Sequence, residues 1–433
     1  MDSMLRRRSF IQSAAAVGAL TAPVVRTQAR DKKYVTATAG TGWWGMNITR
    51  VAIQSGECDV VAICDVDTNQ SKAAADEIET MTGKRPQIFG DYREMIEKIK
   101  PEIMIVGTPD HWHPLIAIAA MNAGAHVYVE KPVAHTIKEG RAMVNAARGN
   151  ERIVQVGTHR RVSPHNQWAI NYMKEGKLGE IGMIRAFVHY GGGAGSPTPD
   201  EEPPEHLDWD MWCGPGPLVP YNRRMHPKGF RSFLNFANGT LGDWGIHWMD
   251  HITWWSEEPY PKKVSSFGGR HIKRDNTDAP DTQIAQFDYE TFTAVWEHRQ
   301  YAANNAEKHN LGIYFYGTEG TMHIGWVGDG STFYPANKNK DIINVQPQLH
   351  EPDQQNIPEL FADFLDSIKN NKRSVCDIEI GHRSTSLSLL GMLSLKLGRS
   401  VEWDGDKEMI VGDDEANSML KREYRDPWKY PEA

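Results

Sequence analysis

The chain has 433 residues, which is enough for two domains with separate hydrophobic cores. Its formal net charge of −8 argues against a nucleic acid or an anionic membrane surface as its partner. The four cysteines show no C-x-x-C spacing and indicate neither a disulfide framework nor a zinc site; they are Cys58, Cys64, Cys213 and Cys376.

The first 30 residues predict an export signal rather than part of the fold. The twin arginines Arg7 and Arg8 precede Ser9-Phe10-Ile11, and a short apolar run covers residues 14–20, in a pattern that resembles a Tat signal. The run is too short to span a bilayer, so we expect no membrane insertion of the mature chain. We predict cleavage near residues 27–29 and a periplasmic or secreted protein, with a disordered basic tail as the alternative.

The first predicted strand, over residues 34–40, runs into a glycine motif of the form G-x-G-x-x-G. A helix is expected from residue 46. Glycines in this motif permit a tight turn and a close approach of the backbone to a pyrophosphate, and the free N–H groups of the helix bind the phosphates. We therefore predict a dinucleotide site at this motif, formed by Gly40, Gly42, Trp43, Trp44 and Gly45. The alternative is a glycine-rich turn with no ligand.

A second predicted strand, over residues 59–65, ends in Asp65, which lies 20 residues after Gly45. A carboxylate at this position takes the hydroxyls of the adenosine ribose and repels a 2′-phosphate. The sequence therefore predicts NAD rather than NADP as the cofactor.

Strands and helices continue to alternate up to about residue 158. Helices are predicted over residues 71–82, 91–100, 115–123 and 137–147, and strands over residues 103–107, 126–129 and 153–157. This alternation is typical of a doubly wound parallel sheet, so we predict an α/β Rossmann domain over residues 31–158.

The strand that begins at His126 ends in Glu130-Lys131-Pro132. Pro132 has no N–H and disfavours a helical Lys131, so Lys131 should stand at the carboxyl end of the strand, where open α/β sheets bind ligands. A lysine there can donate to a substrate oxygen. The alternative is a Glu130–Lys131 pair that merely closes the strand, and these residues alone do not decide between the two.

The second half of the chain has a different pattern. A strand over residues 181–190 and a loop-rich stretch over residues 191–224 precede a helix over residues 240–255. Short strands then follow in series, over residues 264–267, 282–289, 292–298, 312–316 and 320–324, before helices over residues 358–368 and 381–397. Strands in series favour an antiparallel sheet, so we predict an α+β domain over residues 159–433 with an open, mostly antiparallel sheet.

One helix of this second domain carries residues suited to acid–base chemistry. Asp243, His247 and Asp250 are spaced i, i+4 and i+7, so they share a helix face. A histidine held by a carboxylate is a general base for a hydroxyl proton. His247 and His251 could instead hold a metal, or the cluster could be a hydrogen-bonded core feature. Beside a dinucleotide domain the acid–base interpretation is favoured, and no metal is predicted.

Three motifs together resemble the Gfo/Idh/MocA family, that of glucose–fructose oxidoreductase and inositol dehydrogenase. They are Glu130-Lys131-Pro132, Thr108-Pro109-x-x-x-His113 and Asp243-x-x-x-His247. The resemblance implies bound NAD(P) and an open sheet used for oligomerisation. It also implies that Lys131 contacts the reacting hydroxyl, that His247 accepts its proton and that Asp243 orients His247. Further cofactor contacts implied by the resemblance are Thr108, Pro109, His111, His113, Glu130, Lys131 and His159.

Two features depart from the family pattern. Trp43 and Trp44 are bulky inside the glycine loop, where the family often has small or basic residues, and His159 stands where it often has Asn or Gln. These departures bear on the geometry around the nicotinamide and leave the cofactor class unchanged.

The loop over residues 207–215 and the tail over residues 424–428 look like a secreted bacterial branch of the family. A related exported branch contains NAD-dependent glycosidases, which oxidise a sugar C3 hydroxyl, eliminate the aglycone, add water and re-reduce. The resemblance thus implies a sugar, glycoside or polyol substrate and a homo-oligomer, dimer or tetramer. The predicted export to a compartment with no obvious NAD pool implies that NAD is tightly bound. Candidate substrate contacts are Arg161, His165, Tyr221 and Arg231, and for each the alternative is a polar surface or packing position. A non-catalytic sugar or NAD sensor on the same fold is the alternative from another class.

Overall fold

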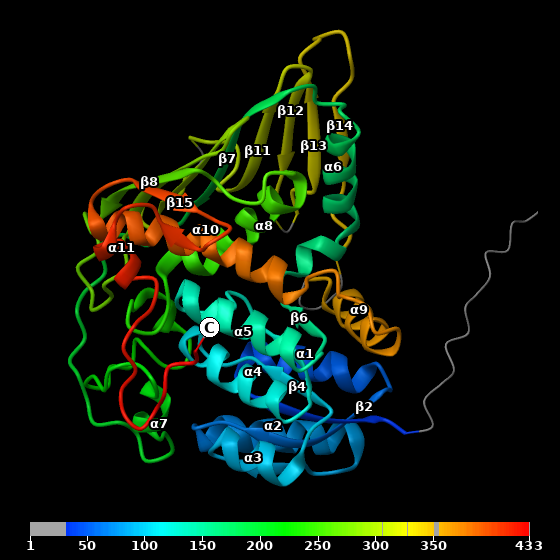
Figure 1. Ribbon diagram of the computed structural model, residues 1–433, viewed down its shortest axis with the longest axis vertical. Coiled ribbons are helices and arrows are strands. Elements are labelled where there is room, and N and C mark those ends of the chain that lie inside the picture. The colour runs from blue at the N-terminus through cyan, green and yellow to red at the C-terminus, as the bar shows by residue number, and fades with distance from the viewer. Residues whose placement is uncertain (1–31, 305, 327, 350–354, 433) are drawn as a thin grey trace, which may run out of the picture.

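The computed structural model describes residues 32–304, 306–326, 328–349 and 355–432, which form two domains, one at each end of the view in Figure 1. The predicted export signal over residues 1–30 lies outside this part of the chain. Among the described residues, no helix combines the length and the apolar character needed to cross a bilayer.

The first domain contains a six-stranded sheet in the order β3-β2-β1-β4-β5-β6, and all of its strand pairs are parallel. This is the predicted doubly wound sheet, and its strand order reverses between β1 and β4, where such folds bind ligands. Its strands are β1 (Tyr34–Ala39), β2 (Cys58–Cys64), β3 (Gln87–Phe89), β4 (Ile103–Val106), β5 (His126–Val129) and β6 (Val154–Val156). Its helices are α1 (Trp43–Gln54), α2 (Thr68–Thr82), α3 (Tyr92–Ile99), α4 (His113–Asn122) and α5 (Ile137–Gly149). The sequence did not predict β3, which has only three residues, two of them exposed.

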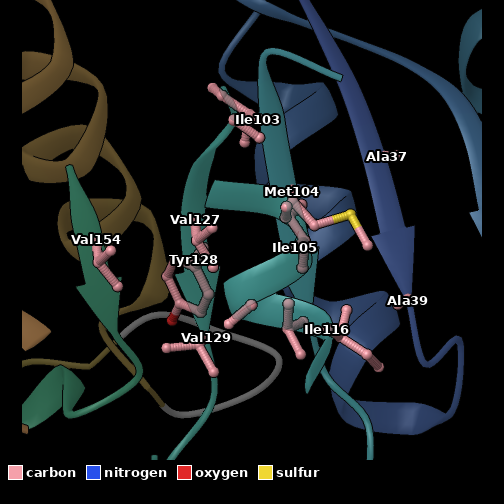
Figure 2. Close-up of a cluster of buried hydrophobic side chains, with 14 of the residues drawn as sticks. Ala37, Ala39, Ile103, Met104, Ile105, Ile116, Val127, Tyr128, Val129 and Val154 are labelled. Carbon is pink, nitrogen blue, oxygen red and sulfur yellow. The ribbon is translucent and has the colours of Figure 1, made fainter. Parts of the chain in front are cut away.

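The core of this sheet is apolar on both faces because helices cover both. All four residues of β4 are buried, and Figure 2 shows Ile103, Met104 and Ile105 beside Val127, Tyr128 and Val129 of β5. The Tyr128 ring packs against Phe361 and Phe364, with centroids 6.0 and 6.2 Å away. Both phenylalanines belong to α9 (Ile357–Lys369), far along the chain.

The sequence predicted that residues 31–158 form the first domain, and segments much later in the chain also pack into it. Its hydrophobic core also includes buried side chains of α9, together with Cys376, Ile378 and Trp428. The helical periodicity of α9 shows that one face is buried, but it does not say which sheet that face covers.

The second domain is built on a ten-stranded sheet in the order β14-β13-β12-β11-β7-β10-β9-β8-β15-β16. Only the β7–β10 pair is parallel among these strands, so the predicted open and mostly antiparallel sheet is confirmed. The strands are β7 (Ile181–His189), β8 (Lys263–Gly269), β9 (Thr282–Asp288), β10 (Thr293–Arg299), β11 (Leu311–Gly317), β12 (Gly320–Ile324), β13 (Ser331–Pro335), β14 (Ile343–Val345), β15 (Val401–Asp404) and β16 (Met409–Ile410). The helices are α6 (Pro164–Lys174), α7 (Trp209–Cys213), α8 (Ile246–Trp255), α10 (Ile378–Leu397) and α11 (Asp414–Ser418). Of these elements, α6, α7, α11 and the last four strands were not predicted.

The two faces of this sheet differ. Side chains of α8 and α10 pack on one face and complete the second core. On the other face Phe267 and Ile284 are directly paired across β8 and β9 and are 69% and 51% exposed. Around Phe267 and Ile284, this face of the sheet is left open to solvent by the described residues.

The predicted helix over residues 240–255 has two parts. Leu241–Gly245 forms a π-helical turn, and α8 follows directly from Ile246. A π turn closes i→i+5 hydrogen bonds and shifts the phase of the side chains, and such turns are frequent at functional sites.

Candidate active site

A cavity of about 480 Å³ opens between the two domains, within the range typical of small-molecule sites. The first domain contributes residues that directly follow its strands: Gly40 after β1, Asp65 after β2, Thr108 after β4 and Glu130 after β5. The second domain contributes aromatic and charged side chains to the same cavity. Aromatic side chains from both domains form one wall of the cavity: Trp43, Trp44, Tyr92, Trp112, Trp212, Phe230, Trp244 and Trp326.

The three glycines of the loop after β1 have different roles. Gly40 has φ +82°, and a Cβ there would stand 2.6 Å from the carbonyl carbon of Gly107. A Cβ on Gly45 would stand 1.9 Å from the Gly40 carbonyl oxygen, so helix and strand pack too closely for any side chain. A Cβ on Gly42 would meet nothing within 4 Å, and Gly42 lines the cavity. The first and third glycines are required by packing, and the second leaves room for a ligand.

This difference predicts opposite effects for two similar substitutions. Gly45→Ala should lower the free energy of unfolding by about 1–3 kcal/mol because backbone must move. Gly42→Ala should leave stability unchanged but weaken NAD binding, since its methyl group enters the cavity. Thermal unfolding and NAD titration followed by tryptophan fluorescence would measure both. A Gly42→Ala protein that binds NAD as tightly as the parent would contradict this assignment.

Asp65 ties the end of β2 to the glycine loop. Its Oδ2 accepts hydrogen bonds from the Thr41 N–H at 2.7 Å and the Thr41 hydroxyl at 2.9 Å, and its Oδ1 accepts one from the Asp67 N–H at 3.0 Å. Burial raises the pKa of Asp65, against the effect of these bonds. The carboxylate lines the cavity, as predicted for the ribose contact.

The residues present fit a bound dinucleotide. Gly42 offers open space beside the first turn of α1, which has free N–H groups for phosphates. The buried Thr108 hydroxyl at the cavity has no hydrogen-bond partner among the described residues, so a ligand can satisfy it.

Lys131 and Asp243 join the two domains at the cavity. The Lys131 Nζ donates to the Asp243 carboxylate at 2.8 Å and to its backbone carbonyl at 3.0 Å, and the Arg231 Nε donates to the same carboxylate at 3.1 Å. Burial alone would raise the pKa of Asp243, but the two cations outweigh it and hold that pKa below its usual range. Asp243 is therefore a carboxylate that orients Lys131.

His247 lies in the same cavity but is not bonded to Asp243. Its buried Nδ1 has no partner among the described residues, and its ring centroid lies 4.9 Å from that of Trp326 and 5.5 Å from that of His159. The structure thus corrects the prediction that Asp243 orients His247, because the π turn places Asp243 against Lys131 instead. Burial, and next the charge of Lys131, lower the pKa of His247 well below its usual value. The ring is a neutral imidazole that can accept a proton.

The cavity brings together most of the predicted cofactor residues. Those that line it are Gly40, Gly42, Trp43, Trp44, Asp65, Thr108, Pro109, Glu130, Lys131 and His159. Gly45, His111 and His113 do not. The Nε2 of His111 lies 3.0 Å from the Trp212 carbonyl oxygen, so the structure places His111 in the interior and outside the lining of this cavity. His113 stands behind the site, 2.8 Å from each of the carbonyl oxygens of Thr108 and Pro132.

Of the four predicted substrate contacts, only Arg231 lines the cavity. Arg161 forms a buried two-pronged pair with Asp250, at 2.8 and 2.9 Å. His165 is fully buried, and the Tyr221 ring packs edge-on against Trp209. Arg161, His165 and Tyr221 thus lie outside the lining of this cavity and have packing roles, which was the alternative for each. Asp250, which was predicted to share the face of His247, is instead paired with Arg161.

The metal alternative is not supported by the geometry of the two histidines. The Nδ1 of His251 lies 2.7 Å from the His247 carbonyl oxygen, so that ring nitrogen is engaged with its own helix. His189, Glu297 and Glu307 could hold an ion elsewhere, but Arg185 and Arg299 already pair with these carboxylates.

The loop over residues 191–236, from which the sequence offered Tyr221 and Arg231 as candidate contacts, encloses one end of the cavity. The Thr68 N–H donates to the His206 carbonyl at 2.8 Å and the Asp208 N–H to the Val66 carbonyl at 3.0 Å. The Nε2 of His226 lies 2.9 Å from an Asp67 oxygen. This docking beside Asp65 brings Met211, Trp212 and Lys228 to the cavity. The Asp-Trp-Asp-Met-Trp run at residues 208–212 was the available signal.

A glycine loop, a carboxylate for the ribose and a lysine beside a neutral histidine, at the carboxyl edge of a doubly wound sheet, define an NAD-binding oxidoreductase. The comparisons agree. Residues 36–158 match the model described as "Oxidoreductase family, NAD-binding Rossmann fold", and residues 187–430 match "Oxidoreductase family, C-terminal alpha/beta domain". The chain belongs to the Gfo/Idh/MocA oxidoreductase family.

Individual relatives differ in how much of the chain they match. D-glucoside 3-dehydrogenase of Escherichia coli K12 is 23% identical over 361 residues, covering 80% of this chain and 90% of that protein. Glycosyl hydrolase family 109 protein 1 of Akkermansia muciniphila is 31% identical over 150 residues, which cover 34% of this chain and 31% of that protein. Among solved structures, levoglucosan dehydrogenase in complex with NADH has a TM-score of 0.67 at 18% identity, over 86% of this chain and 99% of that one. This last likeness shows the fold alone.

Proposed function

We propose that the protein transfers hydride between tightly bound NAD and a carbinol of a sugar, glycoside or polyol. The observation that carries the proposal is the convergence of Lys131 and His247, from different domains, on one cavity beside the glycine loop. A sensor that only binds NAD would not need a neutral histidine and an oriented lysine at the same point.

The aromatic wall supports a sugar as substrate. Trp244 and Trp326 pack edge-on beside His247, and indole faces suit the C–H faces of a pyranose. Arg231 adds a polar donor that can fix hydroxyl groups. The similarity to D-glucoside 3-dehydrogenase over most of both chains favours a glucoside C3 hydroxyl.

The residues divide the reaction between them. The ammonium of Lys131, held by Asp243, donates to the substrate hydroxyl oxygen and stabilises the charge that develops there. The neutral His247 accepts the hydroxyl proton, for which its lowered pKa keeps it available. NAD, when bound on the glycine loop, supplies the acceptor for the hydride.

We also infer that the cofactor is kept through turnover. Export by the pattern at residues 1–30 would take the protein to the periplasm or beyond, away from a supply of NAD. The enclosing loop docked through His226 and Asp67 favours slow cofactor release. A redox-neutral reaction then follows, either sugar–sugar oxidoreduction or glycoside cleavage by transient C3 oxidation. The local similarity to a family 109 glycosyl hydrolase favours the second route.

The test begins with denaturing the purified full chain and assaying the supernatant for NAD. We expect nearly one NAD per chain, and turnover of a member of a glycoside panel without added cofactor. His247→Gln should retain NAD but lose turnover. Absence of released nucleotide, with activity strictly dependent on added NAD, would rule out the closed cycle. Bound NAD with no turnover on any sugar would instead favour the sensor.

We propose further that a second copy covers the open sheet face. Phe267 and Ile284 are costly to leave in water, and a patch of this kind marks an interface. Light scattering at micromolar concentration should give a dimer or tetramer. Phe267→Asp should shift the protein toward the monomer without changing its thermal unfolding profile otherwise. A clean monomer of the parent protein would refute this proposal.

A further inference from the structure

Asp110 is a buried acid in the cavity that the hydride step does not use. It follows β4 in the loop that carries Thr108, is 5% exposed and lines the cavity with Lys131 and Arg231. Its Oδ2 has no hydrogen-bond partner among the described residues. A buried carboxyl oxygen without a partner is costly, so it needs a reason.

The charged neighbours of Asp110 are already engaged with another group. Lys131 and Arg231 both donate to Asp243. Burial raises the pKa of Asp110 to about 7, with Arg231 and Lys131 opposing the rise and Asp243 adding to it. Near neutral pH the carboxyl group therefore exists in both protonation states, which is the condition for giving and taking a proton at little cost.

We propose that Asp110 is a second catalytic residue, which removes the proton from the substrate carbon next to the carbinol that Lys131 and His247 serve. The proposal rests on the proposed function and names its substrate class, a glycoside whose oxidised form carries a leaving group β to the new ketone. A 3-keto glucoside has this arrangement, with the C2 proton beside the ketone and the aglycone on C1.

The step balances within the cavity. The C2–H bond breaks, its proton goes to the Asp110 carboxylate, and its electron pair forms a C2–C3 double bond while the ketone oxygen becomes an enolate. Lys131 stabilises this oxygen as it does in the hydride step. The enolate then collapses, the C1–O bond breaks, and the departing oxygen takes the proton from Asp110. The products are an unsaturated ketone and the free alcohol, and Asp110 returns to a carboxylate without an external oxidant.

Glu130 is the rival acid, since burial also raises its pKa to about 7. Its position argues against the role. The Glu130 Oε2 accepts the Lys131 backbone N–H at 3.1 Å, and a Cβ built on Gly157 would stand 2.2 Å from its Oε1. The Glu130 Oε1 also lacks a hydrogen-bond partner among the described residues and Glu130 also lines the cavity, but the Gly157 backbone is packed directly against that oxygen. No glycine backbone packs in this way against the Asp110 Oδ2 among the described residues, which leaves Asp110 as the better placed acid.

The test supplies methyl 3-keto-glucoside to the full-length protein in D₂O, which bypasses hydride transfer. NMR follows loss of the C2 proton and formation of the unsaturated ketone. The parent protein should exchange the proton, with a rate that rises with pH through about 7 as Asp110 loses its proton. Asp110→Asn should lower the rate about 100-fold, and the exposed control Asp76→Asn should not.

The hydride step is measured separately, as reduced nicotinamide absorbance in a single turnover with methyl glucoside. Asp110→Asn should slow exchange at least about tenfold more than it slows this step. Exchange at the parental rate in a folded Asp110→Asn protein would overturn the proposal, as would a parental rate independent of pH between about 5 and 9. If Asp110→Asn does not fold, the exchange rate of Asp110→Glu and the pH profile of exchange by the parent protein test the proposal instead. If the parent protein transfers hydride but does not exchange the C2 proton, the role of Asp110 is refuted and the proposed function stands. If it exchanges the C2 proton but does not transfer hydride, the proposed function is refuted.

Discussion

Lys131→Met should lower kcat/KM for sugar oxidation by about three orders of magnitude, because two contributions are lost together. The substrate oxygen loses its charged donor as negative charge develops on it. Asp243 keeps only Arg231 as a cation, so its pKa rises and the local field around the reacting hydroxyl becomes more negative. Methionine fills the volume of the lysine stem, so the fold should persist. Steady-state turnover of a glucoside without added cofactor would measure the effect, and reduction of the bound NAD in a single turnover would report the oxidation step.

The matched control is Lys98→Met on α3, where the lysine is exposed and pairs with Glu94. It should change neither kinetics nor stability. NAD titration separates binding from chemistry, and Lys131→Met should bind NAD within a few-fold of the parent. If Lys131→Met keeps kcat/KM within tenfold of the parent, Lys131 serves only to pair with Asp243.

Arg161→Met should lower the free energy of unfolding by about 3–5 kcal/mol, because it leaves the Asp250 carboxylate buried without its cation. The two side chains are 7% and 1% exposed, and Ser384 donates a third hydrogen bond to Asp250 at 2.8 Å. Urea unfolding followed by circular dichroism would measure the loss. The double variant Arg161→Met/Asp250→Asn should recover part of it, since no buried charge remains.

Arg85→Met is the matched surface control. Arg85 is exposed and pairs with Asp76 and Glu79, so its loss should cost less than about 1 kcal/mol. An Arg161→Met protein that unfolds like the parent but has lost activity would show that Arg161 acts on the substrate after all.

The first domain could be predicted because its signals are local. β4 and β5 are continuous apolar runs, and the residues that follow parallel strands gather at one edge of the sheet. This is why Asp65 and Lys131 could be placed at one site from the chain alone.

In the second domain, local sequence patterns do not predict which side chains meet at the site. The i, i+4, i+7 spacing of Asp243, His247 and Asp250 assumes an unbroken α-helix, and the π turn at Leu241–Gly245 breaks that assumption. Whether an arginine faces a substrate or a buried acid depends on the partner brought by tertiary packing, as Arg161 and Asp250 show. Asp110 stood in a motif that the sequence singled out, but its role depends on burial, which no local pattern reports.

The contribution of α9 and Trp428 to the first hydrophobic core has a consequence for how the protein is made. During synthesis the ribosome releases the nucleotide-binding half first, yet the phenylalanines that cover Tyr128 emerge more than 200 residues later. Until then that half exposes an unfinished apolar surface, and such surfaces make a folding chain prone to aggregation. Folding is therefore completed only after translation has nearly ended, and an isolated fragment of residues 31–158 lacks part of the core it needs.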